Sequence, residues 1–408
     1  MKYDLLLTGA TVIDPSQNLH GSYDVAVQGD RIAAVAPRLE AEARQRLDLR
    51  GRILTPGWID IHTHLYAGGT TWGIQADALC LATGVTTVVD AGSAGWANFL
   101  AFKEHIADRA RTRMLAFVHV AGIGLAYGPL GELEDLRYAD AERTAFVVHQ
   151  WPETCVGIKV RQGQHQVGTN GVEPLRLAVQ AGELSGTPVM VHIGAGVPLP
   201  SVLELLRPGD IITHCYQGIG DSVTDADGCL LPLVRQARQR GVWFDVGHGG
   251  GSFSFRVARQ ALAQDFASDV ISTDLHAHSL YSTVDSLPHA ASKLLGLGVD
   301  LTAVVRQTTC AAARVIGRQD ELGTLRPGTV ADLAAFEVQE GEFDYVDVHG
   351  QHDPGSQRIR PVLTVRAGRV YQPEELAAEL EEMRRRAALI RNLSNKDWAA
   401  LGWQPGSR

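Results

Sequence analysis

Short apolar runs of five to eight residues recur through the middle of the chain, and each is followed by a loop and a helical segment. This alternation is typical of parallel strands joined by crossover helices, because parallel neighbours need a connection of about a dozen residues or more. Eight strands are expected, at 58–64, 86–91, 114–121, 156–160, 188–193, 211–215, 242–246 and 270–274. They predict an α/β fold, a closed (β/α)8 TIM-type barrel over residues 56–324, with an open doubly wound sheet as the alternative.

The two ends of the chain have a different pattern, of short alternating segments separated by turn-forming residues. Strands are expected early, at 3–8, 23–28, 31–35 and 52–54, and late, at 331–337, 361–367 and 369–371. Because both sets flank the long α/β region, we expect them to build one small β-sandwich domain together, from residues 1–55 and 325–372.

Residues 373–408 are expected to form a C-terminal helical tail. Apolar residues at spacings of four and three lie on one face of a helix, and between 373 and 393 they are Leu376, Leu380, Met383, Ala387 and Ile390. We expect this face to pack on the chain's own barrel in preference to a dimer contact, and a homo-oligomer stays an alternative.

Composition narrows the class of protein. The chain has 408 residues, of which 45% are hydrophobic and 20% charged, and this excludes a disordered or fibrous protein. The net charge is −9 and the basic residues are scattered, so nucleic acid is not an expected partner. The sequence has neither a secretory signal nor a run near the about 20 apolar residues of a membrane span. A cytoplasmic protein with reduced cysteines and no membrane partner is therefore expected.

Metal-binding side chains stand where several of the expected strands end. His62 and His64 end the first strand, and residues at i and i+2 point to the same side of a pleated strand, so both imidazoles can reach one ion. Alone, a His-x-His pair is a weak signal, since such pairs also occur as ordinary polar positions. His192, His214 and Asp274 close three later strands, and in a barrel these positions face one shared mouth.

Lys159 takes the equivalent place in an apolar strand, where an unpaired ammonium would be costly to bury. Considered alone, Lys159 is best explained as a structural lysine with an anionic partner. Beside three strand ends with histidines and one with an aspartate, a second explanation is favoured. A neutral lysine amine that captures carbon dioxide becomes an anionic carbamate, whose two oxygens can bridge two cations.

The order His-x-His, Lys, His, His, Asp on successive strands resembles the binuclear amidohydrolase superfamily over nearly the whole chain. The resemblance includes the segment 54–64 before and through the first strand and the late segment 323–333. It implies that one divalent ion is held by His62, His64 and Asp274, and the other by His192 and His214. It also implies that carboxylated Lys159 and a hydroxide bridge the two ions.

The resemblance implies hydrolysis of an acyl bond in a small-molecule substrate. The ions, most simply zinc although similar ligands accept manganese, cobalt or iron, activate the hydroxide and polarise the carbonyl group. Asp274 is then both a metal ligand and the catalytic proton shuttle to the leaving group. A barrel that serves only as a non-catalytic scaffold is the competing class, and the presence of all six ligand side chains argues against it.

Within the superfamily the chain resembles the amidohydrolase/deacetylase group, which hydrolyses acyl, often acetyl, esters or amides of small substituted carboxylic acids. The segments that carry this likeness are 68–73, 90–95 and 272–276. A dihydroorotase-like cyclic amidase is the alternative. Dihydroorotases carry His-x-His-x-Arg, and Tyr66 stands here in place of the arginine, which counts against that activity.

Four further residues are candidates for substrate contact. Arg161 lies two residues after Lys159 on the same strand face, and it would clamp a substrate carboxylate or, equally, form a structural ion pair. Tyr127, His248 and His276 lie in or near the expected mouth loops and could orient an acyl oxygen. The glycine-rich segment 247–253 lacks the Lys-Ser/Thr ending of a phosphate-binding loop, so a mobile active-site loop is expected there.

Overall fold

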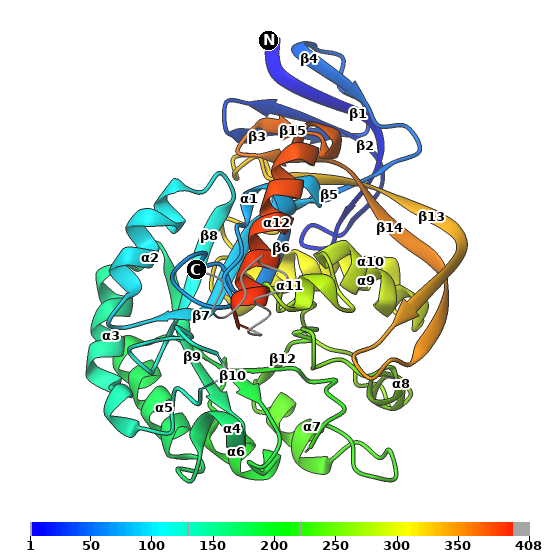
Figure 1. Ribbon diagram of the computed structural model, residues 1–408. Helices are drawn as coiled ribbons and strands as arrows, with labels where there is room; N and C mark the ends of the chain where they lie inside the picture. The colour runs from blue at the N-terminus through cyan, green and yellow to red at the C-terminus, as the bar shows by residue number, and fades with distance from the viewer. Residues whose placement is uncertain (1, 129, 221, 395–408) are drawn as a thin grey trace, which may run out of the picture.

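Two sheets organise the protein in the computed structural model, which describes residues 2–394 apart from 129 and 221 (Figure 1). The first is a seven-stranded parallel sheet in chain order, built from β6 (Trp58–Thr63), β7 (Val85–Gly95), β8 (Arg113–His119), β9 (Cys155–Gln162), β10 (Val189–Ile193), β11 (Ile211–Thr213) and β12 (Trp243–Phe244). Its strands overlap the first seven apolar runs of the sequence. β7 and β9 are buried along their whole length, because both faces of the sheet are covered.

The eighth apolar run makes backbone contacts on both of its sides without an extended ladder. Val246 N donates to Val270 O at 3.1 Å, and His248 N donates to Ser272 O at 3.2 Å. On the other side His64 N donates to Leu275 O at 2.9 Å. Residues 270–275 therefore lie between the segment after β12 and the end of β6.

One buried cluster fills the space enclosed by the curled parallel sheet. It joins side chains from successive strands to Val270 and to α11 (Cys310–Val315); the strand members are Ile59, Ile61, Val89, Ala91, Leu115, Phe117, Val156, Met190 and Ile211. A larger cluster packs the outer strand faces against the helices.

The surrounding helices follow the strands along the chain. The α-helices are α1 (Asp77–Ala82), α2 (Phe99–His105), α3 (Ala141–Gln150), α4 (Gln164–Val167), α5 (Glu173–Ser185), α6 (Leu199–Leu205), α7 (Pro232–Gln239), α8 (Phe255–Leu262), α9 (Leu287–Gly296), α10 (Leu301–Thr308) and α12 (Ala377–Ser394). Short 3₁₀ helices are η1 (Ala107–Arg109), η2 (Leu136–Tyr138), η3 (Ser279–Tyr281) and η4 (Pro373–Leu376).

The second sheet combines strands from both ends of the chain. Its strands are β1 (Lys2–Asp14), β2 (Leu19–Gln28), β3 (Arg31–Ala36), β4 (Glu42–Asp48), β5 (Ile53–Pro56), β13 (Leu333–Val346), β14 (His352–Arg366) and β15 (Arg369–Tyr371). The path runs β15-β14-β13-β5-β1-β2-β3, and β4 pairs with β1. Strand β4 was not expected from the sequence, because its polar residues show no apolar alternation.

The β13–β14 hairpin is longer than the sequence pattern indicated, and its far half reaches the parallel-sheet region (Figure 1). There Val348 N donates to Phe253 O at 3.2 Å. Ile359 N donates to Ser292 Oγ on α9 at 2.9 Å. The hairpin thus links the second sheet to a loop and a helix of the α/β region.

Helix α12 covers the expected C-terminal amphipathic segment and packs beside α1. Met383 and Ala387 are buried on its inner face, and Leu380 and Ile390 are partly buried there. Residues 395–408 of the expected tail lie outside the described residues. No helix in the described ranges is long and apolar enough to cross a lipid bilayer.

The contact between the two sheets gives a first prediction. Gly84, at φ +84°, lies where an added Cβ would be 2.5 Å from the Phe336 ring of β13, whereas Gly186, at φ +68°, has open space around it. Gly84→Ala should lower the free energy of unfolding by about 2–5 kcal/mol, through backbone strain and overpacking. Gly186→Ala should cost only the strain, about 1–2 kcal/mol. Urea unfolding of both variants measures the difference, and equal losses would show that the Phe336 contact is not tight.

Candidate metal centre

Three of the expected ligands form a compact buried group. His62 comes from β6, His64 follows that strand, and Asp274 lies in the segment that hydrogen-bonds to it. One ligand atom of each lies within 4.8 Å of the others. Asp274 Oδ1 is 3.4 Å from His62 Nε2 and 3.1 Å from His64 Nε2.

The other three expected ligands lie against this group. Lys159 Nζ is 3.1 Å from His62 Nε2, so the β9 lysine points into the same centre. His214 Nε2 is 2.7 Å from His192 Nδ1, and the rings of His62 and His214 are 5.1 Å apart. All six predicted side chains therefore converge. Among the described residues, only His62, His64 and Asp274 form a group whose ligand atoms are close enough to one another to hold one ion.

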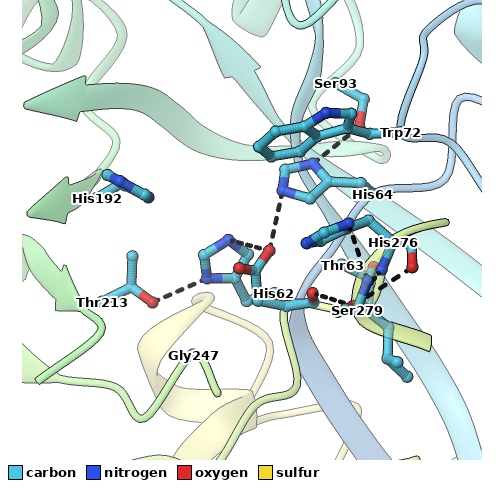
Figure 2. Close-up of polar contacts among 12 residues, drawn as sticks. His62, Thr63, His64, Trp72, Ser93, His192, Thr213, Gly247, His276 and Ser279 are labelled. Carbon is cyan, nitrogen blue, oxygen red and sulfur yellow. Dashed lines mark hydrogen bonds and ion pairs between the residues drawn. The ribbon is translucent and has the colours of Figure 1, made fainter. Parts of the chain in front are cut away.

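Hydrogen bonds on the far side of the imidazoles set their orientation (Figure 2). Thr213 Oγ1 donates to Asp245 Oδ2 at 2.7 Å, so it accepts from His62 Nδ1, which is 2.8 Å away. The Gly247 carbonyl accepts from His214 Nδ1 at 2.6 Å. In both rings the proton is on Nδ1, and the Nε2 lone pair is directed to the centre.

The electrostatics of this arrangement fit a cation. Burial, and after it the nearby Lys159, lowers the pKa of His62 well below its usual range, so this ring is neutral. Asp274 Oδ1 is buried and accepts no hydrogen bond from the described residues. A carboxylate oxygen and an imidazole lone pair that face each other repel unless a positive ion lies between them. Nitrogen and carboxylate donors of this kind suit zinc and similar divalent ions.

Backbone strain marks two of the same residues. His214 and Asp274 have φ values of 68° and 49°, in the left-handed region that side chains other than glycine rarely adopt. Strained backbone of this kind persists where the surrounding contacts hold it, which is common at functional sites.

A cavity of about 340 Å³ opens onto the centre. All the expected ligands except His214 line it, and the other lining residues include Trp72, Arg161, Gln166, Ser252, His276 and His278. Its volume suits a small-molecule ligand.

Arg161 borders this cavity and is also held in a buried ion pair. Its Nε and Nη2 donate to the two Glu132 carboxylate oxygens at 2.8 and 2.6 Å. Burial by itself raises the pKa of Glu132, but the charge of Arg161 and contacts with His119 outweigh burial and hold this pKa well below the usual range. The structural pairing expected as one role for Arg161 is present, and its guanidinium still faces the cavity, stacked on Trp72 at 5.1 Å.

The other three substrate-contact candidates are placed differently. His276 lines the cavity and stacks on Trp72, with ring centroids 4.7 Å apart. Its Nδ1 accepts from two backbone N–H groups, which leaves Nε2 as the donor. Tyr127 is 44% exposed, and neither it nor the fully buried His248 belongs to the described lining of the cavity.

Sequence reasoning missed several residues that support the site. Thr213 directly precedes His214, and Asp245 is the last residue but one of the strand-like run 242–246, so a search near the strand ends could have found both. Trp72 lies in a segment already singled out, but nothing marked its ring as a cavity wall. Glu132 comes from a long loop with no periodic signal, and only the tertiary structure brings it to Arg161.

Similarity to individual known proteins shows the family of the chain, although no family model matches it. It is 39% identical over 333 residues to a deacetylase of Agrobacterium fabrum, with 81% of this chain and 82% of that protein covered. A crystal structure of an adenine deaminase superposes with a TM-score of 0.85 at 32% identity, covering 91% of this chain and 100% of the other.

A crystal structure of a dihydroorotase superposes with a TM-score of 0.84 at 35% identity, covering 90% of this chain and 97% of the other. The two solved structures share the overall fold of this chain, and the three relatives differ in the activities that their names state. Together with the buried His-Asp group, they show that the chain is a metal-dependent hydrolase of ester or C–N bonds that belongs to the deacetylase group of the amidohydrolase superfamily.

Proposed function

We propose that the protein is a binuclear deacetylase that hydrolyses acyl, above all acetyl, esters or amides of small substituted carboxylic acids. One observation carries the proposal. Asp274 Oδ1 is buried and lies 3.4 Å from His62 Nε2 and 3.1 Å from His64 Nε2. The relatedness to a deacetylase over most of both chains supports the choice of reaction.

In this proposal the two ions are zinc, held by the six convergent side chains. His62, His64 and Asp274 would hold the first ion, and His192 and His214 would hold the second. Carboxylated Lys159 would supply both ions with a further anionic ligand. Burial lowers the pKa of Lys159 to about 7, which supplies the neutral amine that must form an N–C bond to carbon dioxide and release a proton.

When bound, the ions would polarise the acyl carbonyl and lower the pKa of water. The protein's own groups do the rest. Asp274 takes the proton of the attacking water on a carboxylate oxygen and delivers it to the leaving group. His276 is neutral, since burial lowers its pKa to about 3, and its Nε2–H donates to an acyl oxygen. Arg161 binds the substrate carboxylate through the part of the guanidinium that Glu132 does not use.

The proposal includes closure of the parallel sheet into a (β/α)8 barrel. Support comes from residues 270–275, which hydrogen-bond to both neighbours, and from the internal cluster shared by successive strands. We also propose the domain division expected from the sequence, with residues 56–324 as the barrel. Residues 1–55 and 325–372 form the β-sandwich, because β1 pairs with β4 and then with β5 and so lets the sheet fold into two layers. Residues 373–408 form the tail.

The −9 charge and the small cavity support a small-molecule substrate, without nucleic acid or a membrane as partner, in a cytoplasmic protein. A dihydroorotase-like cyclic amidase is the second candidate, favoured by the similarity to the solved dihydroorotase. Tyr66 counts against it, because it packs on Phe102 and is outside the described cavity lining. A non-catalytic scaffold protein is the least supported of the three candidate functions.

Screening of N- and O-acetylated small acids against zinc-loaded protein tests the proposal, with dihydroorotate as the comparison. Acetylated acids should be turned over, and their methyl esters should show a kcat/KM lower by about 10- to 100-fold, since a charge-assisted bond is worth about 1.5–3 kcal/mol. Turnover of dihydroorotate alone would favour the cyclic amidase. No turnover of any ester or amide at full metal content would favour the scaffold.

Replacement of the proton shuttle gives a further prediction. Asp274→Asn should keep the fold and much of the metal, while kcat falls by about 10²- to 10⁴-fold because the amide cannot accept the proton. Steady-state kinetics with parallel metal analysis measure both effects. Asp108→Asn, which changes an exposed aspartate paired with Lys103, is the matched control and should leave kcat unchanged. Near-wild-type turnover in Asp274→Asn would disprove the shuttle.

Lys159→Ala should remove the bridge and leave fewer than two ions per chain after dialysis, as measured by elemental analysis. Wild-type protein equilibrated with ¹³C-labelled bicarbonate should show a carbamate carbon signal that the variant lacks. Lys103→Ala removes a lysine that pairs with Asp108 and is outside the described cavity lining, and it should keep both ions. Two fully occupied sites in Lys159→Ala would rule out the carbamate.

A further inference from the structure

The loop that follows β12 contacts the centre at several points. Its Gly247 carbonyl accepts from His214 Nδ1 at 2.6 Å. An added Cβ on Gly249 would lie 2.5 Å from Asp274 Oδ2, so the backbone packs directly on that carboxylate. Gly250 and Gly251 continue the loop as part of the cavity wall. A glycine-rich backbone gains such a fixed shape only if other groups hold it.

Lys293 on α9 supplies such a contact from outside the loop. Its side chain is buried, with 1% of the residue exposed. Nζ lies 2.9 Å from His248 Nε2 and 2.8 Å from Val346 O, and it also donates to Thr283 O. These acceptors come from the loop, from the end of β13 and from the segment before α9.

The protonation of His248 is consistent with this bond. Its Nδ1 donates to Gly249 O at 2.9 Å, so Nε2 is the acceptor for Lys293. Burial lowers the pKa of Lys293 to about 7, and the charges of Asp285 and Asp347 oppose that effect. The three acceptors around Nζ match the three N–H groups of an ammonium ion.

The β13–β14 hairpin holds the other end of the same loop. Asp347 Oδ2 accepts from Phe255 N at 3.0 Å, and Val348 N donates to Phe253 O at 3.2 Å. The Phe253 ring also stacks on His248, with centroids 4.5 Å apart. Helix α9, the hairpin and the loop therefore meet around Lys293.

We propose that Lys293 is a positioning residue for the metal centre, which acts by fixing His248 and so the backbone of residues 247–251. The fixed loop keeps the Gly247 carbonyl on His214 and Gly249 against Asp274. The role of His248 is then to anchor this loop, not to contact the substrate. The catalytic consequence rests on the proposed function, whereas the anchoring of the loop does not.

Hydrogen exchange in the metal-free protein tests the anchor directly. The amides of His248 and Gly249 donate to Ser272 O and Thr273 O, and they report on loop opening. In Lys293→Met, exchange across residues 247–252 should be at least about 10-fold faster. In the zinc-loaded enzyme kcat should fall by about 10- to 100-fold with little change in KM, as expected when a ligand's hydrogen-bond partner is loosened.

Ser292→Ala is the matched control on the same helix. It removes the bond from Ile359 N to Ser292 Oγ, which ties α9 to β14 without reaching the loop. This variant should lower the unfolding midpoint and leave both loop exchange and kcat unchanged. If Lys293→Met shows the same behaviour as Ser292→Ala, Lys293 is only a structural residue and the proposal is overturned.

His248→Phe provides a second test should Lys293→Met not fold. The new ring keeps the stack on Phe253 and removes the acceptor for Nζ. Faster exchange at residues 247–252 supports the anchor, and wild-type exchange overturns it. This measurement needs neither ion nor substrate, so it separates failure of the anchor from failure of the proposed hydrolase activity.

Discussion

The centre depends on several electron-pair donors being held together in a buried place. His62 and His214 cannot turn away, because their outward Nδ1 atoms are bound to Thr213 and to the Gly247 carbonyl. Asp274 faces His62 and His64 with an oxygen that accepts no hydrogen bond in the described part of the chain. A cation shared among these groups would remove their mutual repulsion, and the parallel strands with their loops supply the rigid frame.

Much of this frame could be predicted from the sequence, for a physical reason. Parallel strands that are buried on both faces are mostly apolar, so β6 to β11 are visible as apolar-rich runs, and a polar residue near the end of such a run is conspicuous. Lys159 and His192 were found in this way. The eighth run was found by composition, yet no rule foretold that it would make bonds on both sides without forming a regular ladder.

The structural features that the sequence did not predict depend on contacts between segments that are distant in the chain. Strand β4 and the far half of the β13–β14 hairpin are polar, so their pairing leaves no apolar alternation to read. Glu132 reaches Arg161 from a loop, and Lys293 reaches His248 from a helix 45 positions later in the chain. Burial of a charged side chain can be recognised in a sequence only when its surroundings are already known.

The pairing of β5 with β13 has a consequence for how the protein is made. Leu54 lies opposite Ala335, so one edge of β5 finds its partner only after the whole intervening α/β region has been synthesised. Until then that edge exposes unpaired backbone N–H and C=O groups, which favour strand pairing with other nascent chains. Contacts so distant in sequence also slow folding. Ribosome-bound intermediates of this protein should accordingly be clients for chaperones until the late hairpin emerges.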